Sequence, residues 1–318
     1  MMHEVTLPDG TRMPALGAGT WHMGEEPARR SEELDALDES LRCGVRLIDT
    51  AEMYGDGAAE ELVGEALRAA NGDVRRDELF VVGKVLPTNA GRGRIRASLA
   101  GSLERLGLDY LDMYLLHWRG DVPLVETIEC MEGLRADGLV RRWGVSNFDM
   151  EDMDELMAAQ RDMLGNGAFD GCRSASGGAD GVADGTKVQA AVTGCAANQV
   201  LYHLGSRGVE VALKPWMAVR RMPMMAYCPL AQGGTLTHGL MDSPVVMDVA
   251  KRHDATPAQV LLAWTMRDGM TIAIPKASTA EHARQNAGAA SLRLDADDLA
   301  QLDAAFPAPR QRVPLDWL

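Results

Sequence analysis

The chain has 318 residues, 46% of them hydrophobic, and carries a formal net charge of −14. This acidic balance argues against non-specific binding to nucleic acid or to an anionic membrane surface, although a local basic pocket can still hold an anionic cofactor. No apolar run reaches the length of a membrane span, and the first residues lack the basic and apolar segments of a signal peptide. The five cysteines are scattered, without a C-x-x-C pair or a histidine at metal-ligand spacing. We therefore expect a cytoplasmic protein with reduced thiols and no metal site.

The first half of the chain alternates short apolar segments with amphipathic ones. Residues 4–15 are predicted to form a β-hairpin, because Asp9-Gly10 supplies a turn with positive φ. Strands are expected at residues 16–21, 45–48, 78–84, 110–117 and 140–147. Helices are expected at residues 28–43, 58–70, 95–106, 123–136 and 149–160. In the fourth of these helices, the residues predicted to face inward are Val125, Ile128, Met131 and Leu134.

The alternation breaks between Arg161 and Gly194, where Gly, Ala, Asp and Ser dominate. Such a composition buries too little apolar surface to offset the entropy cost of ordering the chain. We interpret residues 161–194 as a flexible surface insertion, with a lid or a partner-binding loop as the alternative. Ser278 to Glu281 fits a capping box that opens the last barrel helix. Further strands are expected at residues 196–200, 222–227 and 271–276, and further helices at residues 208–221 and from Thr256 onward.

Eight strands, each followed by a helix and with polar residues at their carboxyl ends, predict an α/β fold of the (β/α)8 TIM-barrel type. The hairpin precedes the barrel and the Gly/Ala/Asp-rich insertion interrupts it, so residues 1–318 are expected to form a single domain. A doubly wound nucleotide-binding fold is the alternative. It is disfavoured because the chain has neither a G-x-G-x-x-G turn after its first strand nor a P-loop.

Ionisable and polar side chains stand at four of the predicted strand ends. They are Asp49 with Tyr54, Lys84, His117, and the pair Ser146-Asn147. Each has a structural alternative: a carboxylate that holds a turn, a packed phenol, a rim lysine, a histidine satisfied in the interior, or polar turn residues. Active sites of such barrels lie at the carboxyl ends of the strands, so the shared placement in one mouth favours chemistry over packing.

Several segments together resemble the aldo-keto reductase family over essentially the whole chain. They are residues 19–21, 49–55, Lys84, 115–118, 144–148, Asn198-Gln199, 226–230 and 274–276. Residues 198–207 are most similar to bacterial members of the methylglyoxal-reductase type, in which the insertion at 161–194 has no counterpart. The resemblance implies that a small aldehyde or ketone is reduced by NADPH, with NADH also possible. It further implies a monomer.

The resemblance assigns the catalytic positions to Asp49, Tyr54, Lys84 and His117. A carbonyl oxygen becomes an alkoxide when its carbon receives hydride, so a proton donor must stand beside it. Tyr54 is the expected general acid, and the Lys84 ammonium is expected to lower the Tyr54 pKa below its usual value of about 10. Asp49 is expected to keep Lys84 charged and oriented. His117 is expected to donate a hydrogen bond that positions and polarises the carbonyl.

Pocket walls and nicotinamide contacts are implied by the same resemblance. Trp21 and Trp118 would form apolar walls of the substrate pocket, with core packing as the alternative. Tyr227 would stack on the nicotinamide ring. The residues implied to hold the nicotinamide amide are Ser146, Asn147 and Gln199.

A third group of residues is expected at the adenosine end of the cofactor. Lys276 and the amino end of the helix after it are placed to bind the 2′-phosphate. Many NADPH-preferring relatives have Ser directly after this Lys and Arg six residues after it, whereas this chain has Ala277 and His282. Ser278 and Arg284 are candidates to replace them, although Ser278 fits a helix cap as well. The residues implied to contact the adenine are Gln285 and Asn286.

A second class of function stays open on sequence alone: a slow, cofactor-binding regulatory module, resembling the aldo-keto-reductase-shaped subunits of potassium channels. In that case the insertion at 161–194 would supply the partner surface. A pure sensor has no need of a tuned proton donor, so the complete catalytic set favours the enzyme. The sequence does not identify the physiological carbonyl. The loops after His117, the insertion at 161–194 and the tail from Ala308 to Leu318 are expected to set that choice.

Overall fold

The computed structural model describes residues 4–70, 73–165, 194–231 and 239–317. Within these residues, eight parallel strands form one sheet in which each strand pairs with its neighbours in sequence order. Two bridges join the edge strands, Leu16 to Ala273 and Gly19 to Lys276, and close the sheet into a barrel. The predicted (β/α)8 barrel is thereby confirmed. Its strands are β3 (Gly17–Gly19), β4 (Leu47–Asp49), β5 (Phe80–Val85), β6 (Met113–Leu116), β7 (Trp143–Ser146), β8 (Cys195–Leu201), β9 (Met224–Tyr227) and β10 (Thr271–Ala273).

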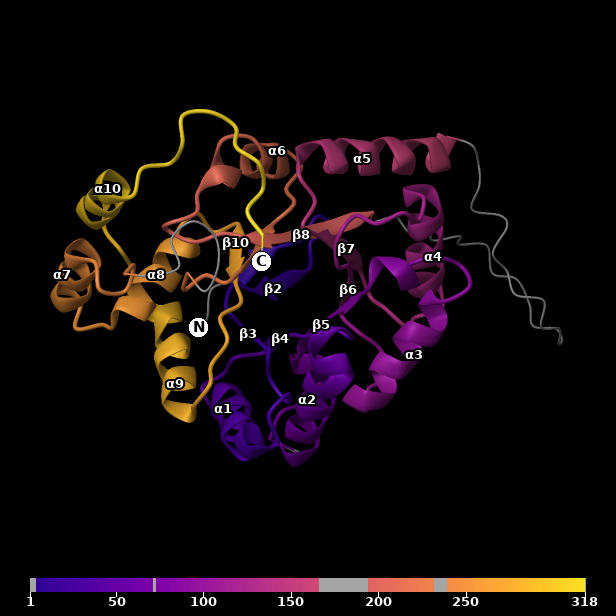
Figure 1. The fold of residues 1–318 in the computed structure, drawn as a ribbon, viewed down its shortest axis with the longest axis horizontal. Coiled ribbons are helices and arrows are strands. Elements are labelled where there is room, and N and C mark those ends of the chain that lie inside the picture. Colours follow the sequence, from indigo (N-terminus) through magenta and orange to yellow (C-terminus); the bar gives the residue numbers. More distant parts are fainter. Residues whose placement is uncertain (1–3, 71–72, 166–193, 232–238, 318) are drawn as a thin grey trace, which may run out of the picture.

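Helices surround the barrel, as Figure 1 shows. In this ring α1 packs against both α9 and α2, and α2 also packs against α3. The helices are α1 (Arg30–Arg42), α2 (Ala58–Ala69), α3 (Ile95–Leu106), α4 (Leu124–Ala136), α5 (Met150–Gly165), α6 (Leu213–Val219), α7 (Pro244–Arg252), α8 (Pro257–Thr265), α9 (Ala280–Gly288) and α10 (Ala296–Ala305).

The predicted hairpin is formed by β1 (Glu4–Thr6) and β2 (Arg12–Pro14), which pair antiparallel. Its apolar side chains, such as Met13, are buried in the same cluster as the inward-facing residues of the barrel strands. Arg142, directly before β7, donates a hydrogen bond from Nε to Asp9 in the hairpin turn at 2.6 Å. The hairpin therefore covers the amino ends of the strands and leaves their carboxyl ends open.

Alternation along the strands decides which side chains reach the barrel interior. Leu47 and Val82 belong to the interior cluster, whereas Ile48 lies in the cluster between the strands and the surrounding helices. Two residues further along each strand, the inward positions are Asp49 and Lys84. The pleat of the sheet thus delivers a carboxylate and an ammonium to the same end of the interior.

Two predicted helices differ from the structure. The helix expected at residues 208–221 is divided into η6 (Gly208–Glu210) and α6 (Leu213–Val219). The ring of Pro215 would clash with the carbonyl of Val211, four residues earlier, so one continuous helix is excluded. Helix α5 extends to Gly165, so the first residues of the predicted insertion, 161–165, are helical. Residues 166–193 of that insertion lie outside the described part of the chain.

The buried face of α4 also differs from the prediction. Val125 is 42% exposed, and Leu124 is buried in its place. Leu124, Ile128 and Met131 are spaced by four and three residues, which keeps them on one face of a helix. Val125 lies about 100° further around the helix axis and therefore points to solvent.

The capping prediction for the last barrel helix was one residue early. Thr279, not Ser278, is the N-cap of α9, and its Oγ1 accepts a hydrogen bond from His282 N at 3.1 Å. Helices α7 and α10 were not predicted at all. Each nevertheless carries a start signal, Pro244 in the first turn of α7 and a capping box at Asp295 before α10.

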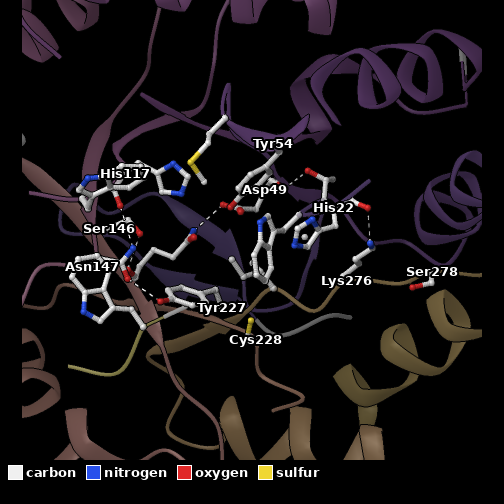
Figure 2. A pocket seen from close by; sticks show the side chains of 18 residues that line it. His22, Asp49, Tyr54, His117, Ser146, Asn147, Tyr227, Cys228, Lys276 and Ser278 are labelled. Carbon is white, nitrogen blue, oxygen red and sulfur yellow. Dashed lines mark hydrogen bonds between the residues drawn. The ribbon is translucent and has the colours of Figure 1, made fainter. Parts of the chain in front are cut away.

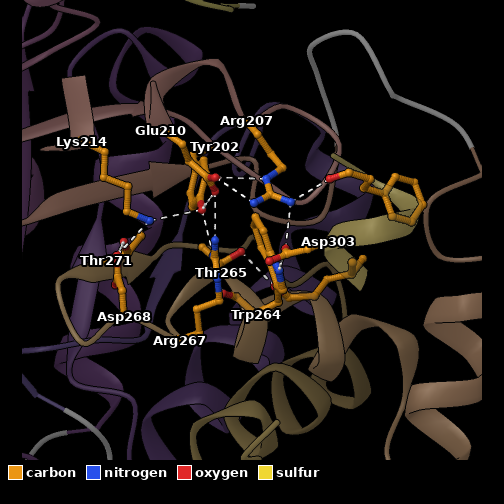
Figure 3. Close-up of polar contacts among 12 residues, drawn as sticks. Tyr202, Arg207, Glu210, Lys214, Trp264, Thr265, Arg267, Asp268, Thr271 and Asp303 are labelled. Atoms are coloured by element: carbon orange, nitrogen blue, oxygen red, sulfur yellow. Dashed lines mark hydrogen bonds and ion pairs between the residues drawn. The ribbon is translucent and has the colours of Figure 1, made fainter. Parts of the chain in front are cut away.

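A polar network fastens the loop after β8 to α8 and α10 (Figure 3). Arg207 is buried and donates hydrogen bonds to Asp303 Oδ1 at 2.8 Å and to Phe306 O at 2.7 Å. Tyr202 Oη accepts a hydrogen bond from Arg267 at 2.9 Å. Because Phe306 directly follows α10, this network fixes the point at which the C-terminal segment leaves that helix.

No helix in the described part of the chain is long and apolar enough to cross a membrane. The same residues contain no group of three or more His, Cys, Asp or Glu side chains placed to hold a metal ion. The cysteines that the structure describes form no disulfide bond with one another.

Candidate active site

A cavity of about 710 Å³ opens at the carboxyl ends of the barrel strands (Figure 2). Its size is in the range of sites that hold small organic ligands. Lys84 lies directly behind the wall and is fully buried. The predicted site residues that line the cavity are Trp21, Asp49, Tyr54, His117, Trp118, Ser146, Asn147, Gln199, Tyr227, Lys276 and Ser278.

Asp49, Lys84 and Tyr54 form a hydrogen-bonded chain in the cavity wall, in which only Lys84 does not line the cavity. Lys84 Nζ donates to Asp49 Oδ1 at 2.5 Å and to Tyr54 Oη at 2.9 Å. Its third hydrogen bond goes to Thr50 O at 3.0 Å. All three protons of the ammonium are thereby used, which fixes the position of Nζ against the phenol.

Burial and charge oppose each other along this chain. Burial alone would lower the pKa of Lys84, but the neighbouring Asp49 carboxylate and Tyr54 outweigh it and raise the Lys84 pKa. For Tyr54, burial raises the pKa by more than the Lys84 ammonium lowers it. The prediction that Tyr54 has a pKa below its usual value was therefore wrong for the free protein. The phenol holds its proton and the lysine stays charged.

His117 packs edge-on against Tyr54 in the cavity wall, with 5.7 Å between ring centroids and an interplanar angle of 72°. The side chain is buried, and its Nδ1 has no hydrogen-bond partner among the described residues. Burial and the positive charge of Lys84 lower the His117 pKa to about 2. The imidazole is therefore neutral and presents one N–H donor.

Gln199 and Ser146 connect two neighbouring strands behind the cavity. Gln199 Nε2 donates to Asp49 Oδ2 at 2.8 Å, so both oxygens of that carboxylate are engaged. Ser146 Oγ donates to Gln199 O at 3.0 Å. In the free protein, the Gln199 amide is thus hydrogen-bonded to the same carboxylate, Asp49, that accepts a hydrogen bond from Lys84.

Asn147 follows directly after β7 in a left-handed backbone conformation, with φ of 57°. Its Nδ2 donates to His117 O at 3.2 Å, and its Oδ1 accepts from Tyr227 Oη at 2.9 Å. An asparagine tolerates this backbone region better than most residues. Its side chain links the ends of β6, β7 and β9 on one side of the cavity.

The residues predicted for the adenosine end of a cofactor divide into two groups. Lys276 and Ser278 line the cavity, and Lys276 Nζ donates to His22 O at 2.8 Å. Arg284 is exposed and pairs with Glu39 at 3.1 Å and Glu281 at 2.9 Å. Two further predicted residues do not line the cavity: Gln285, which donates to Glu281 at 3.0 Å, and Asn286, which donates to Lys276 O at 3.4 Å.

Sequence reasoning missed several cavity residues. Cys228 directly follows Tyr227, so the rule that strand ends carry the site would have found it. Trp317 gives no such signal, because it lies on the C-terminal segment that arches back from α10 and ends over the barrel in Figure 1. That segment is held where Asp316 accepts a hydrogen bond from Ser206. The other missed residues are Gly19, Thr20, His22, Met53 and Ile274.

Comparisons with known proteins agree with this geometry. Residues 15–306 match the model of the Aldo/keto reductase family. The chain is 45% identical to methylglyoxal reductase YeaE of Escherichia coli K12, over 96% of this chain and 95% of that protein. It is 32% identical to methylglyoxal reductase DkgA of the same organism, over 94% of this chain and 91% of that protein.

A solved structure shares the whole architecture. It is an aldo/keto reductase from Klebsiella pneumoniae in complex with NADP and acetate, which matches with a TM-score of 0.84 and 43% identity over 100% of both chains. The family match spans most of the sequence, and the solved structure has the same barrel fold. The chain therefore belongs to the aldo/keto reductase family and is an oxidoreductase.

Proposed function

We propose that the protein reduces aldehydes and ketones to alcohols with NADPH as the hydride donor, and that small 2-oxoaldehydes such as methylglyoxal are its substrate class. The observation that carries the proposal is the buried chain of Asp49, Lys84 and Tyr54 that faces the cavity. The names of the Escherichia coli relatives support the substrate class. The NADP and NADPH complexes of the Klebsiella reductase support the cofactor.

The groups around the cavity fit a nicotinamide dinucleotide. Ser146, Asn147 and the Tyr227 ring lie on one side, and the Lys276 ammonium and Ser278 hydroxyl lie on the other (Figure 2). We assign the first group to the carboxamide and ring of the nicotinamide and the second to the adenosine 2′-phosphate. When bound, the nicotinamide supplies the hydride.

Tyr54 is the proposed general acid. Its phenol gives a proton to the carbonyl oxygen as hydride reaches the carbonyl carbon, so that an alcohol and a phenolate result. The Lys84 ammonium, 2.9 Å from the phenol oxygen, stabilises the phenolate left after the transfer. Asp49 keeps that ammonium charged through its 2.5 Å hydrogen bond. Solvent then returns the proton to Tyr54.

His117 is proposed to orient the carbonyl. Its neutral ring cannot compete as an acid at physiological pH, and it offers a single N–H to the carbonyl oxygen. The His117 ring stands beside the Tyr54 ring and both line the cavity, so the two groups can reach the same oxygen. The oxygen is thereby held where the phenol proton is delivered.

Three tryptophans supply the proposed apolar walls of the substrate pocket. Trp21 and Trp118 line the cavity from the ends of β3 and β6, and Trp317 lines it from the C-terminal segment. Trp317 remains 58% exposed, so it stands at the mouth rather than in the core. Flat aromatic walls can pack against the carbon skeleton of a small carbonyl compound while its oxygen meets the polar groups of the site.

The test is a panel of simple aldehydes, ketones and 2-oxoaldehydes with NADPH and with NADH, read from the nicotinamide absorbance. We expect turnover with NADPH, highest for the 2-oxoaldehydes. A protein that binds NADPH but reduces none of the panel would contradict the proposal and would favour the regulatory module instead.

A further inference from the structure

Glu52 lies between two of the proposed catalytic residues, yet it is not among the described residues that line the cavity. Its half-buried carboxylate reaches across to the segment after β5 and to α3. Oε1 accepts hydrogen bonds from Leu86 N at 2.7 Å and from Asn89 Nδ2 at 3.0 Å. Oε2 accepts from Ser98 Oγ at 2.5 Å. One side chain thus collects three donors from two other parts of the chain.

The main-chain pairing of β4 with β5 weakens where Glu52 stands. Thr50 N still donates to the backbone of β5 at 2.9 Å, but the next bond, from Glu52 N to Lys84 O, lengthens to 3.4 Å. Beyond this point the chain leaves the sheet and enters η2 (Tyr54–Gly57). The Glu52 carboxylate therefore joins the two segments where their backbone hydrogen bonds end.

We propose that Glu52 is a positioning residue that sets the distance between Tyr54 and Lys84. Glu52 stands two residues before Tyr54, and its donor Leu86 stands two residues after Lys84. Its three hydrogen bonds fix the two segments that present the phenol and the ammonium to each other at 2.9 Å. The inference rests on the proposed function, because it concerns the placement of the same proton donor.

Two substitutions separate positioning from simple stability. Glu52→Ala removes all three hydrogen bonds and is expected to lower kcat by roughly 10- to 100-fold, because small misplacements of reacting groups are costly. The KM for the carbonyl is expected to change by less than about threefold. In Glu52→Gln, the side-chain oxygen still accepts from Leu86 and Asn89, and the amide donates to Ser98, whose hydroxyl turns to Tyr114 Oη at 3.3 Å. This variant is expected to keep kcat within about threefold of the wild type.

Glu132→Ala is the matched control for the loss of a partnered carboxylate. Glu132 in α4 accepts hydrogen bonds from Trp143 Nε1 at 2.8 Å and from Arg135 Nε at 2.7 Å, and it is not among the described residues that line the cavity. We expect Glu132→Ala to lower the unfolding temperature at least as much as Glu52→Ala but to keep the wild-type kcat. A Glu52→Ala protein with a lowered unfolding temperature and an unchanged kcat would overturn the proposal.

Crystal structures of the Glu52 variants test the inference without any activity measurement. The separation of Tyr54 Oη and Lys84 Nζ is expected to exceed hydrogen-bond distance in Glu52→Ala and to stay at 2.9 Å in Glu52→Gln. An unchanged separation in Glu52→Ala overturns the proposal. If the wild type reduces no carbonyl, the proposed function fails, and this comparison alone decides the role of Glu52.

A double variant covers the case in which Glu52→Ala does not fold. Asn89→Ala with Ser98→Ala removes two of the three donors and leaves the carboxylate and Leu86 in place. We expect kcat to fall several-fold, which is less than for Glu52→Ala. A double variant with the kcat of the wild type would speak against the positioning role.

Discussion

Lys84 and His117 belong to the same barrel mouth, yet the protein holds one charged and the other neutral. Lys84 is fully buried, which disfavours its charge, but the Asp49 carboxylate and Tyr54 beside it together outweigh the cost of removing the ammonium from water and raise its pKa. His117 meets the opposite conditions, because burial and the charge of Lys84 both lower its pKa. The chemistry assigned to each residue follows from this difference.

Tyr54→Phe is the sharpest single test of the proposed acid. The substitution removes the phenolic proton and leaves the ring, so kcat is expected to fall by about 10²- to 10⁴-fold while NADPH affinity stays unchanged. Tyr110→Phe is the matched control, because the Tyr110 ring packs under Arg76 and Arg141 and is not among the described residues that line the cavity. Equal turnover in Tyr54→Phe and Tyr110→Phe would refute the assignment. Steady-state kinetics and a nucleotide binding titration provide both readouts.

The pKa shifts also fix the pH dependence of reduction. Tyr54 must carry its proton, so activity is lost as the pH rises through the Tyr54 pKa, which burial places above its usual 10.0. His117, with a pKa of about 2, stays neutral throughout the working range. We expect kcat to be flat from about pH 5 to 9 and to fall only above about pH 10. An inflection near the usual histidine pKa in the kcat profile would show that His117 titrates after all.

Substitutions of Lys276 and Arg284 test which of these two basic side chains binds the 2′-phosphate of the cofactor. Lys276 lines the cavity, whereas Arg284 is engaged by Glu39 and Glu281. Lys276→Met is expected to raise the KM for NADPH by roughly tenfold with little effect on NADH, because one charge-assisted contact to phosphate is lost. Arg284→Met, the matched control, is expected to leave both values unchanged. A larger effect from Arg284→Met would mean that its ion pairs open to meet the phosphate.

At the scale of helices and strands, the start of a helix was predicted correctly where only one nearby residue could act as its N-cap. The dipeptide Thr256-Pro257 predicted the start of α8, and the structure shows the full capping box with Gln259. The N-cap of α9 was predicted one residue early, because Ser278 and Thr279 are adjacent hydroxyl residues and either can cap the helix. Only the path of the chain, which places Ser278 at the cavity, decides between them.

Thr256→Ala tests the cap of α8 as an element separate from the site. Thr256 Oγ1 accepts a hydrogen bond from Gln259 N at 3.3 Å, and its loss is expected to lower the free energy of unfolding by about 1 kcal/mol. Thr256→Ser keeps the acceptor and serves as the control. Denaturant titration gives the stability, and kcat is expected to be the same in both variants. A marked loss of kcat in Thr256→Ala would show that α8 supports the site directly.

At the scale of the whole molecule, the barrel depends on a close approach of its edge strands. A Cβ atom on Gly19 would lie 2.7 Å from Ile274 O, so no larger residue fits without moving the backbone. Gly19→Ala is expected to cost about 1–3 kcal/mol of unfolding free energy. Gly133→Ala in α4 is the matched control, because no atom lies within 4 Å of its added Cβ. A Gly19→Ala protein as stable as Gly133→Ala would show that β3 and the segment after β10 can move apart without loss of unfolding free energy.

Much of this architecture was predictable, and the physical reasons are specific. Asp49 and Lys84 were predicted at the ends of buried strands, and parallel strands bring their carboxyl ends together in one barrel mouth. The tail from Ala308 to Leu318 was expected to influence the choice of substrate, but Trp317 could not be singled out within it, because its place depends on the long return path of that segment. The net direction of the Tyr54 pKa could not be predicted either, since burial is known only once the fold is built.

The two bridges that close the barrel join residues far apart in the sequence, and this separation affects the order of events during folding. Trp21, just after the first barrel strand, and Lys276, just after the last, both line the cavity, so the proposed substrate wall and the proposed phosphate site come together only when the barrel closes. Contacts between such remote positions form late, because their loop-closure entropy must be paid first. During refolding from denaturant, recovery of nucleotide binding should therefore lag behind recovery of helical circular dichroism, and the lag would time the closure of the barrel.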